Sequence, residues 1–171
     1  MQGYIQVYTG DGKGKTTAAL GLALRAAGHG LRVFFGQFMK ARATGEVKAI
    51  RERLPEITLR QFGRGHFVRG QPTPADIRAA RRGLDELRAA LRSGRYALVI
   101  ADEANVAVRA GLFAPADLLQ LADEKPPQVE LVFTGRGAPA ALRRRADLVT
   151  EMQARKHYFA RGVRARRGIE E

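Results

Sequence analysis

Residues 4–17 read YIQVYTGDGKGKTT, and this stretch decides the fold. Its first five residues, Tyr4 to Tyr8, form a strand pattern, and a loop with three glycines follows them. Lys15 and two threonines then open a segment rich in alanine and leucine with helical spacing. A strand, a glycine-rich loop and a helix in this order form the setting of a phosphate-binding loop. The loop is a variant, because Thr9 stands where the usual pattern has its first glycine.

Each residue type in this loop has a chemical reason to be there. The glycines let the backbone turn so that its N–H groups face an anion at the positive end of the following helix. Lys15 supplies a mobile cation for phosphate oxygens, and the Thr16 hydroxyl is a ligand for Mg²⁺. The alternative is a glycine-rich turn that binds no ligand. Gly-Lys-Thr in this setting favours a phosphate-binding site. The predicted phosphate site comprises Gly10, Asp11, Gly12, Lys13, Gly14, Lys15, Thr16 and Thr17.

Strand and helix patterns alternate along the rest of the chain. Further apolar runs predict strands at Leu31–Phe38, Ile57–Phe62, Tyr96–Ala101, Val129–Thr134 and Leu148–Met152. Helical spacing predicts helices at Lys15–Ala27, Glu46–Leu54, Pro74–Arg92, Pro115–Glu124 and Pro139–Arg145. This order indicates an α/β protein with a mainly parallel sheet of about six strands. Together with the phosphate loop, it leads us to expect the three-layer P-loop NTPase (RecA-like) fold.

Length and composition limit the classes of protein. With 171 residues, 45% of them hydrophobic, the chain is long enough for one core, so we expect a single domain over residues 1–171. Residues 155–171 lack periodicity but carry Tyr158 and Phe159, so we expect this tail to pack near the site. The chain has no cysteine, which excludes disulfides, thiolate metal sites and cysteine nucleophiles. It has no apolar run long enough for a membrane anchor, and we expect a cytoplasmic protein.

The net charge of +13 has two interpretations. Solvated surface arginine is one, since 24 of the 30 basic residues are arginines spread over helices and loops. A patch that binds nucleic acid is the other. The spread of the charge favours the first interpretation, and we expect no nucleic-acid partner.

Two acids follow the apolar strand of residues 96–101. In P-loop proteins a carboxylate at the end of a central strand holds Mg²⁺ opposite the loop threonine, so we assign Asp102 and Glu103 to the metal together with Thr16. Taken alone, the two acids would sooner indicate the cap of a following helix. Together with the phosphate loop they favour a metal site.

Further segments identify a family beyond a generic P-loop protein. They are DEANVA at 102–107, TGRG at 134–137, DLVTEM at 147–152 ahead of Lys156 and His157, and GVRARRGIE at 162–170. With the loop GDGKGKT at 10–16, the chain resembles the P-loop type of ATP:corrinoid adenosyltransferase over nearly its whole length.

The resemblance implies an enzyme that binds ATP, Mg²⁺ (or Mn²⁺) and a corrinoid reduced to Co(I). Such an enzyme forms a bond between cobalt and the 5′ carbon of ATP, and triphosphate leaves intact. The resemblance also implies a role in cobalamin biosynthesis or salvage, a homodimer, and a flavoprotein or flavodoxin-like electron donor. Because Co(I) is itself a strong nucleophile, the protein has to position the reactants and stabilise charge. We assign Lys15 and Glu103 to these catalytic tasks.

Two further site residues are predicted with open alternatives. Arg136 follows a strand at the carboxyl edge of the sheet, where it contacts phosphate or corrinoid or is simply an arginine in a surface turn. Phe67 lies in the loop FGRGHFV at 62–68, where some family members place aromatic residues against the corrinoid. Phe62 and His66 are the next choices in that loop. These aromatics alternatively cap the edge of the core.

Two other functions compete with adenosyl transfer. In a nucleotide hydrolase or kinase-like enzyme, Glu103 would position water or an acceptor hydroxyl, and ATP alone would yield phosphate. A basic nucleic-acid-binding module would bind with a steep inverse salt dependence and without ATP. Since no interleaved aromatic and basic motif is present, this last function ranks below the others.

Overall fold

A computed structural model describes residues 2–40, 44–65 and 70–170 of the chain. The strands are β1 Ile5–Thr9, β2 Val33–Gln37, β3 Ile57–Gln61, β4 Leu98–Asp102, β5 Glu130–Thr134 and β6 Leu148–Glu151. The helices are α1 Lys15–Gly28, α2 Gly45–Arg53, α3 Pro74–Arg92, α4 Ala104–Arg109, α5 Pro115–Glu124 and α6 Ala140–Arg145. A 3₁₀ turn, η1 Tyr158–Arg161, lies in the C-terminal segment.

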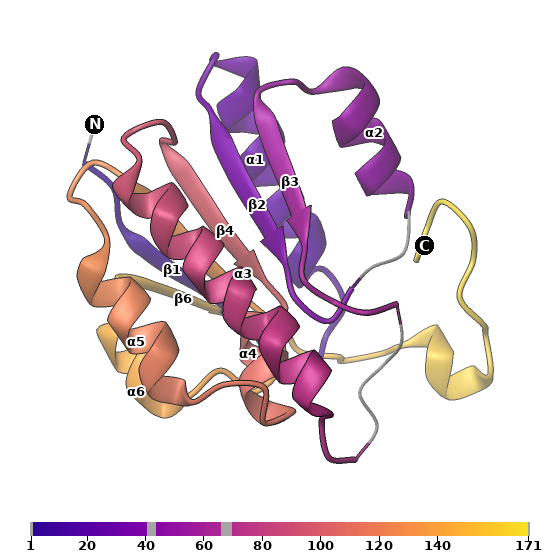
Figure 1. The fold of residues 1–171 in the computed structure, drawn as a ribbon. Helices are drawn as coiled ribbons and strands as arrows, with labels where there is room; N and C mark the ends of the chain where they lie inside the picture. The colour runs from indigo at the N-terminus through magenta and orange to yellow at the C-terminus, as the bar shows by residue number, and fades with distance from the viewer. Residues whose placement is uncertain (1, 41–43, 66–69, 171) are drawn as a thin grey trace.

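The six strands form one sheet in the order β3-β2-β4-β5-β1-β6, and every neighbouring pair is parallel. Helices cover both faces (Figure 1). One buried cluster joins the sheet to α3, α5 and α6, and the other joins it to α1 and α2. The predicted three-layer α/β fold with a parallel sheet is therefore confirmed.

The strand order brings the predicted site together. Because all strands run in the same direction, the loops after β1, β2, β4 and β5 lie at one edge of the sheet. β5 lies between β1 and β4, so Thr134 at the end of β5 lies between the ends of those two strands. Ligands bind at this carboxyl edge in open α/β sheets.

The ends of the helices follow from local chemistry. Thr73 caps α3, and it exchanges hydrogen bonds with Asp76 in a capping box, with Pro74 at the first helical position. The first helix ends at Gly28, and the amides of His29 and Gly30 bond back to the carbonyls of Ala26 and Ala27 respectively, so His29 is a turn residue. Two elements were not predicted from the sequence, the six-residue helix α4 and the turn η1.

Some of the surface arginines are paired with acids across two helices. Arg81 bonds to Asp117 over 2.8 Å, and Glu124 accepts from Arg88 and Arg92 over 3.1 and 3.0 Å, so these pairs join α3 to α5. Exposed pairs of this kind contribute little each, about 0–1 kcal/mol. Within the described ranges, no helix combines the length and the apolar character that a membrane crossing requires.

Candidate active site

The phosphate loop joins β1 to α1 and is fixed by the segment after β6. The Met152 amide donates to the carbonyl of Thr9 over 2.9 Å, and the Gly12 amide donates to the carbonyl of Met152 over 2.7 Å. A Cβ on Gly12 would lie 2.7 Å from that carbonyl oxygen, so the backbone just after β6 leaves no room for a side chain there. Gly14 has a φ of 121°, which favours glycine.

This arrangement qualifies one expectation about the loop. The Gly12 amide bonds to the protein itself in this conformation, so it does not face an anion. The first amides of α1, which have no partner inside the helix, remain as anion donors. The side chains of Asp11 and Thr17 are exposed beside this end of the helix.

Lys15 is the first residue of α1 and is only 8% exposed. Its ammonium donates to the carbonyl of Gly12 over 2.5 Å. Burial, and next the positive charge of Arg136, lower the pKa of Lys15. Binding of an anion would stabilise the charged form of Lys15, because phosphate oxygens would replace the water that the buried ammonium has lost.

Asp102 at the end of β4 is fully buried and accepts four hydrogen bonds. Its Oδ1 accepts from the hydroxyls of Thr16 over 2.9 Å and Thr134 over 2.7 Å. Its Oδ2 accepts from Nε2 of Gln37 over 3.2 Å and from Nζ of Lys40 over 3.3 Å. This carboxylate therefore connects the ends of β2, β4 and β5 to the first turn of α1.

Lys40 is a site residue that the sequence prediction missed. It follows β2 by three residues, at the edge where Asp102 lies, and forms an ion pair with it. The signal was available, because a cation just after a strand of a parallel sheet lies at the carboxyl edge. Lys40 belongs to no recognisable phosphate motif, so motif patterns alone do not indicate it.

Glu103 adopts an unusual backbone conformation next to Asp102. Its φ of 59° is left-handed, a conformation that costs a non-glycine residue about 1–3 kcal/mol. The backbone amide of Glu103 donates to the Thr134 hydroxyl over 3.0 Å. Glu103 precedes α4 but makes no side-chain cap, so a helix follows the two acids without a cap from Glu103. Strain at a carboxylate beside the phosphate loop points to a role in the site.

The surroundings of Glu103 contain charges of both signs. Burial, and next the negative charge of Asp102, raise the pKa of Glu103, while Lys40, Lys15 and Arg136 act in the opposite direction. Its charged form is therefore disfavoured until a further positive charge arrives.

A magnesium or manganese ion fits the donor atoms at this place. Mg²⁺ prefers oxygen ligands and commonly uses one or two carboxylates with substrate phosphates. The Thr16 hydroxyl and Asp102 are in direct contact, and Glu103 is adjacent in the chain. In the part of the chain that the structure describes, no group of three or more acidic, histidine or cysteine side chains is positioned as a complete metal cage. An ion bound here would thus need phosphate oxygens, in addition to protein oxygens, to complete its coordination.

Arg136 lies in the exposed turn after β5, and its charge reaches both Lys15 and Glu103. The turn is joined to α4 by Asn105, whose Nδ2 donates to the carbonyl of Gly135 over 3.1 Å. Arg136 is thus near enough to the phosphate loop to act on an anion bound there.

The aromatic residues of the loop at 62–68 are only partly within the described residues. Phe67 and His66 fall outside the described residues. Phe62 lies in the core, with its ring centroid 5.3 Å from that of Phe38, as the alternative reading of this loop expected. Gly83 of α3 makes room for it, because a Cβ there would lie 2.6 Å from the Phe62 ring.

Comparison with known proteins agrees with this geometry. Residues 1–170 match the family described as ATP:corrinoid adenosyltransferase BtuR/CobO/CobP. A corrinoid adenosyltransferase from a Sinorhizobium species is 37% identical, over 99% of this chain and 80% of its own length. Relatives with the same name from Pseudomonas aeruginosa and Escherichia coli are 35% and 34% identical, over 99% of this chain and 84% and 86% of their lengths. The chain belongs to the ATP:corrinoid adenosyltransferase family.

Proposed function

We propose that this protein transfers the 5′-deoxyadenosyl group of ATP to the Co(I) centre of a reduced corrinoid and releases triphosphate, in adenosylcobalamin biosynthesis or salvage. The family match over residues 1–170 supports this reaction. The observation that carries it at the level of atoms is the contact between Thr16 and Asp102, which joins the phosphate loop to the acidic end of β4.

The reaction balances without a protein nucleophile. The electron pair of Co(I) attacks the 5′ carbon of ATP, the bond from that carbon to the phosphate oxygen breaks, and triphosphate takes the bonding pair. Cobalt becomes Co(III) in the product. The protein contributes orientation and positive charge at the leaving group.

The charge on the leaving triphosphate defines the roles of the loop residues. Lys13, Lys15 and the first amides of α1 bind its oxygens, and Arg136 adds charge from the turn after β5. Thr16, Asp102 and Glu103 hold Mg²⁺ or Mn²⁺, which supplies further positive charge when bound. Gly10, Asp11, Gly12, Gly14 and Thr17 shape the loop.

The remaining parts of the proposal come from the resemblance. Phe67 contacts the corrinoid, a flavoprotein or flavodoxin-like donor delivers the electron that makes Co(I), and the protein is a cytoplasmic homodimer. Sedimentation of the purified chain measures the oligomeric state, and reduction of the corrinoid by added flavodoxin tests the donor.

The test is an anaerobic assay with ATP, Mg²⁺ and chemically reduced corrinoid, followed by the spectral change on formation of the cobalt–carbon bond. Light-sensitive adenosylcorrinoid should form with the wild-type protein and not with Lys15→Ala. Formation at the same rate with both proteins, or no formation with phosphate released from ATP alone, would contradict the proposal. The second of these results would favour the hydrolase.

A further inference from the structure

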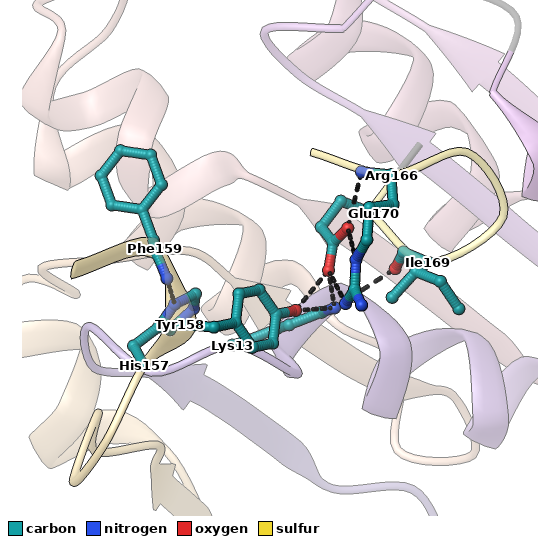
Figure 2. Close-up of polar contacts among 7 residues, drawn as sticks. All are labelled: Lys13, His157, Tyr158, Phe159, Arg166, Ile169 and Glu170. Atoms are coloured by element: carbon teal, nitrogen blue, oxygen red, sulfur yellow. Dashed lines mark hydrogen bonds and ion pairs between the residues drawn. The ribbon is translucent and has the colours of Figure 1, made fainter. Parts of the chain in front are cut away.

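The C-terminal segment binds a side chain of the phosphate loop directly. Nζ of Lys13 lies 2.8 Å from the Tyr158 hydroxyl, 2.8 Å from Oε1 of Glu170 and 3.3 Å from the carbonyl of Ile169 (Figure 2). An ammonium group has three N–H donors. All of the donors of Lys13 are therefore used by the tail, although Lys13 belongs to the loop that is expected to bind phosphate.

Glu170 is held as an anion in this position. Arg166 donates to it from the backbone amide over 2.8 Å and from Nη2 over 3.1 Å, and the Tyr158 hydroxyl also contacts it. Hydrogen bonds from Arg166, Lys13 and Tyr158 hold the pKa of the Glu170 carboxyl well below its usual range. Lys13 and Arg166 also flank the Tyr158 ring, at 5.6 and 4.8 Å from its centroid. The carboxylate of Glu170 thus places a negative charge on Lys13 of the phosphate loop.

The tail lies on the surface and has little apolar anchoring. Phe159 is 76% exposed and Ile169 is 57% exposed, and η1 has no buried residue. Segments with few buried apolar contacts open at low free-energy cost. The polar cluster of Lys13, Tyr158, Arg166 and Glu170 is therefore the main attachment of this end of the tail, and it can be broken without disturbing the core.

We propose that Glu170 is a further residue of the phosphate site, an internal anion that occupies Lys13 between turnovers and is displaced by the polyphosphate of the substrate. This inference rests on the proposed function, because it needs a polyphosphate at the loop. A phosphate oxygen can bind Lys13 only if at least one of the tail acceptors leaves, and a carboxylate beside a polyanion is repelled. Return of Glu170 to Lys13 assists release of the triphosphate product.

The test measures binding of inorganic tripolyphosphate by calorimetry to the wild-type protein and to Glu170→Gln. The variant should bind about two- to fivefold more tightly, the range expected for removal of one exposed charge pair, and the gain should shrink as salt is raised. Glu86→Gln is the matched control, because it removes the same charge on α3, where Glu86 pairs with Arg60 over 3.7 Å. The control should bind as the wild type does.

Three results would overturn the exchange. Equal binding by Glu170→Gln and wild type would show that Glu170 does not compete, and weaker binding by the variant would show that it supports the bound state. In both cases the phosphate site of the proposed function would stand. Absence of tripolyphosphate binding by the wild type would overturn the phosphate site itself and the exchange with it.

Limited trypsin digestion gives a second readout that does not depend on affinity. Cleavage after Arg161 and Arg164 should become faster when tripolyphosphate is added, because the tail has lost its contact with Lys13. In Lys13→Met, cleavage should be fast with and without the ligand. Unchanged or slower cleavage of the wild type on ligand addition would contradict the exchange.

Discussion

The Thr16 hydroxyl donates a hydrogen bond of 2.9 Å to Oδ1 of Asp102, so the first turn of α1 and the end of β4 are in direct contact. The same oxygen accepts from Thr134 over 2.7 Å. A metal ion that bound Thr16 would meet a carboxylate already positioned by the protein. This contact makes Asp102 the link between the stability of the sheet and the proposed chemistry.

Asp102→Asn should reduce both the stability of the protein and its Mg²⁺-dependent activity. The amide keeps the shape but presents N–H groups to a place that holds four donors, and Lys40 loses its anion. We expect the free energy of unfolding to fall by about 1–3 kcal/mol and Mg²⁺-dependent activity to fall about 10- to 100-fold. Urea unfolding and a Mg²⁺ titration of the assay measure the two effects.

Asp85→Asn is the control for this substitution. Asp85 is exposed on α3 and pairs with Arg88 over 3.1 Å, so its variant should keep stability within about 0.5 kcal/mol. A wild-type Mg²⁺ dependence in Asp102→Asn would show that the carboxylate is not part of a metal site.

Lys15→Met should separate binding from stability. Removal of the ammonium should weaken ATP binding about 10- to 100-fold, the scale of lost hydrogen bonds to a charged group. The ligand-free protein should change in stability by less than about 1 kcal/mol. The lost contact with the Gly12 carbonyl is offset, because burial and Arg136 disfavour the cation and lower the pKa of Lys15. Calorimetry measures the weaker ATP binding, and urea unfolding measures the stability. Loss of the fold in this variant would contradict the prediction.

Glu103 should give an acid-side dependence of activity. Its pKa is raised, first by burial and then by Asp102, so the carboxyl gains its proton at a less acidic pH than an ordinary glutamate. If the ionised form holds the metal, Mg²⁺-dependent activity falls as pH drops through this raised pKa, and a higher Mg²⁺ concentration moves the fall to lower pH. A pH profile of kcat/KM at two Mg²⁺ concentrations measures this shift, and coincident profiles would argue against a metal ligand.

Glu103 should affect the stability of the ligand-free protein in the opposite direction, because this stability falls as the pH rises. Between its usual pKa and the raised folded value, the folded state binds more protons than the unfolded state. Its stabilising contribution is therefore complete below the usual pKa and is lost as pH rises through the folded value. Glu103→Gln should remove this loss from the pH dependence of the unfolding free energy.

Two glycine substitutions should change the stability of the protein in opposite directions. Gly12→Ala places a methyl group 2.7 Å from the carbonyl oxygen of Met152, which should cost about 1–3 kcal/mol and displace the phosphate loop. Gly21 lies inside α1, and a Cβ there would meet nothing within 4 Å. Gly21→Ala should therefore stabilise the protein by about 0.5–1 kcal/mol. Thermal unfolding of both variants tests the comparison, and similar shifts in Tm would contradict the described packing of Met152 on the loop.

The parts of the site that the sequence predicts are those with a local signal. The phosphate loop follows a strand and opens a helix, and the acids end a continuous apolar strand, so each is recognisable within about ten residues. A parallel sheet then places both at one edge. The observed contact between Thr16 and Asp102 agrees with these two steps.

The parts that could not be predicted depend on distant contacts. Lys13 and Glu170 lie 157 positions apart, and the tail between β6 and Glu170 has no periodicity that would indicate where it packs. Phe62 lies in the core because Gly83 leaves space on α3, a match of shapes that neither segment shows alone. Helix α4 is short and follows a left-handed Glu103 that makes no side-chain cap, so it has no start signal.

The most direct test of adenosyl transfer is the balance of products in one anaerobic incubation with ATP, Mg²⁺ and reduced corrinoid, measured by phosphorus NMR and by the absorbance of the adenosylcorrinoid. We expect one tripolyphosphate for each adenosylcorrinoid, and neither tripolyphosphate nor phosphate when the corrinoid is omitted. Release of inorganic phosphate from ATP at the same rate with and without corrinoid would contradict the account and would identify a hydrolase.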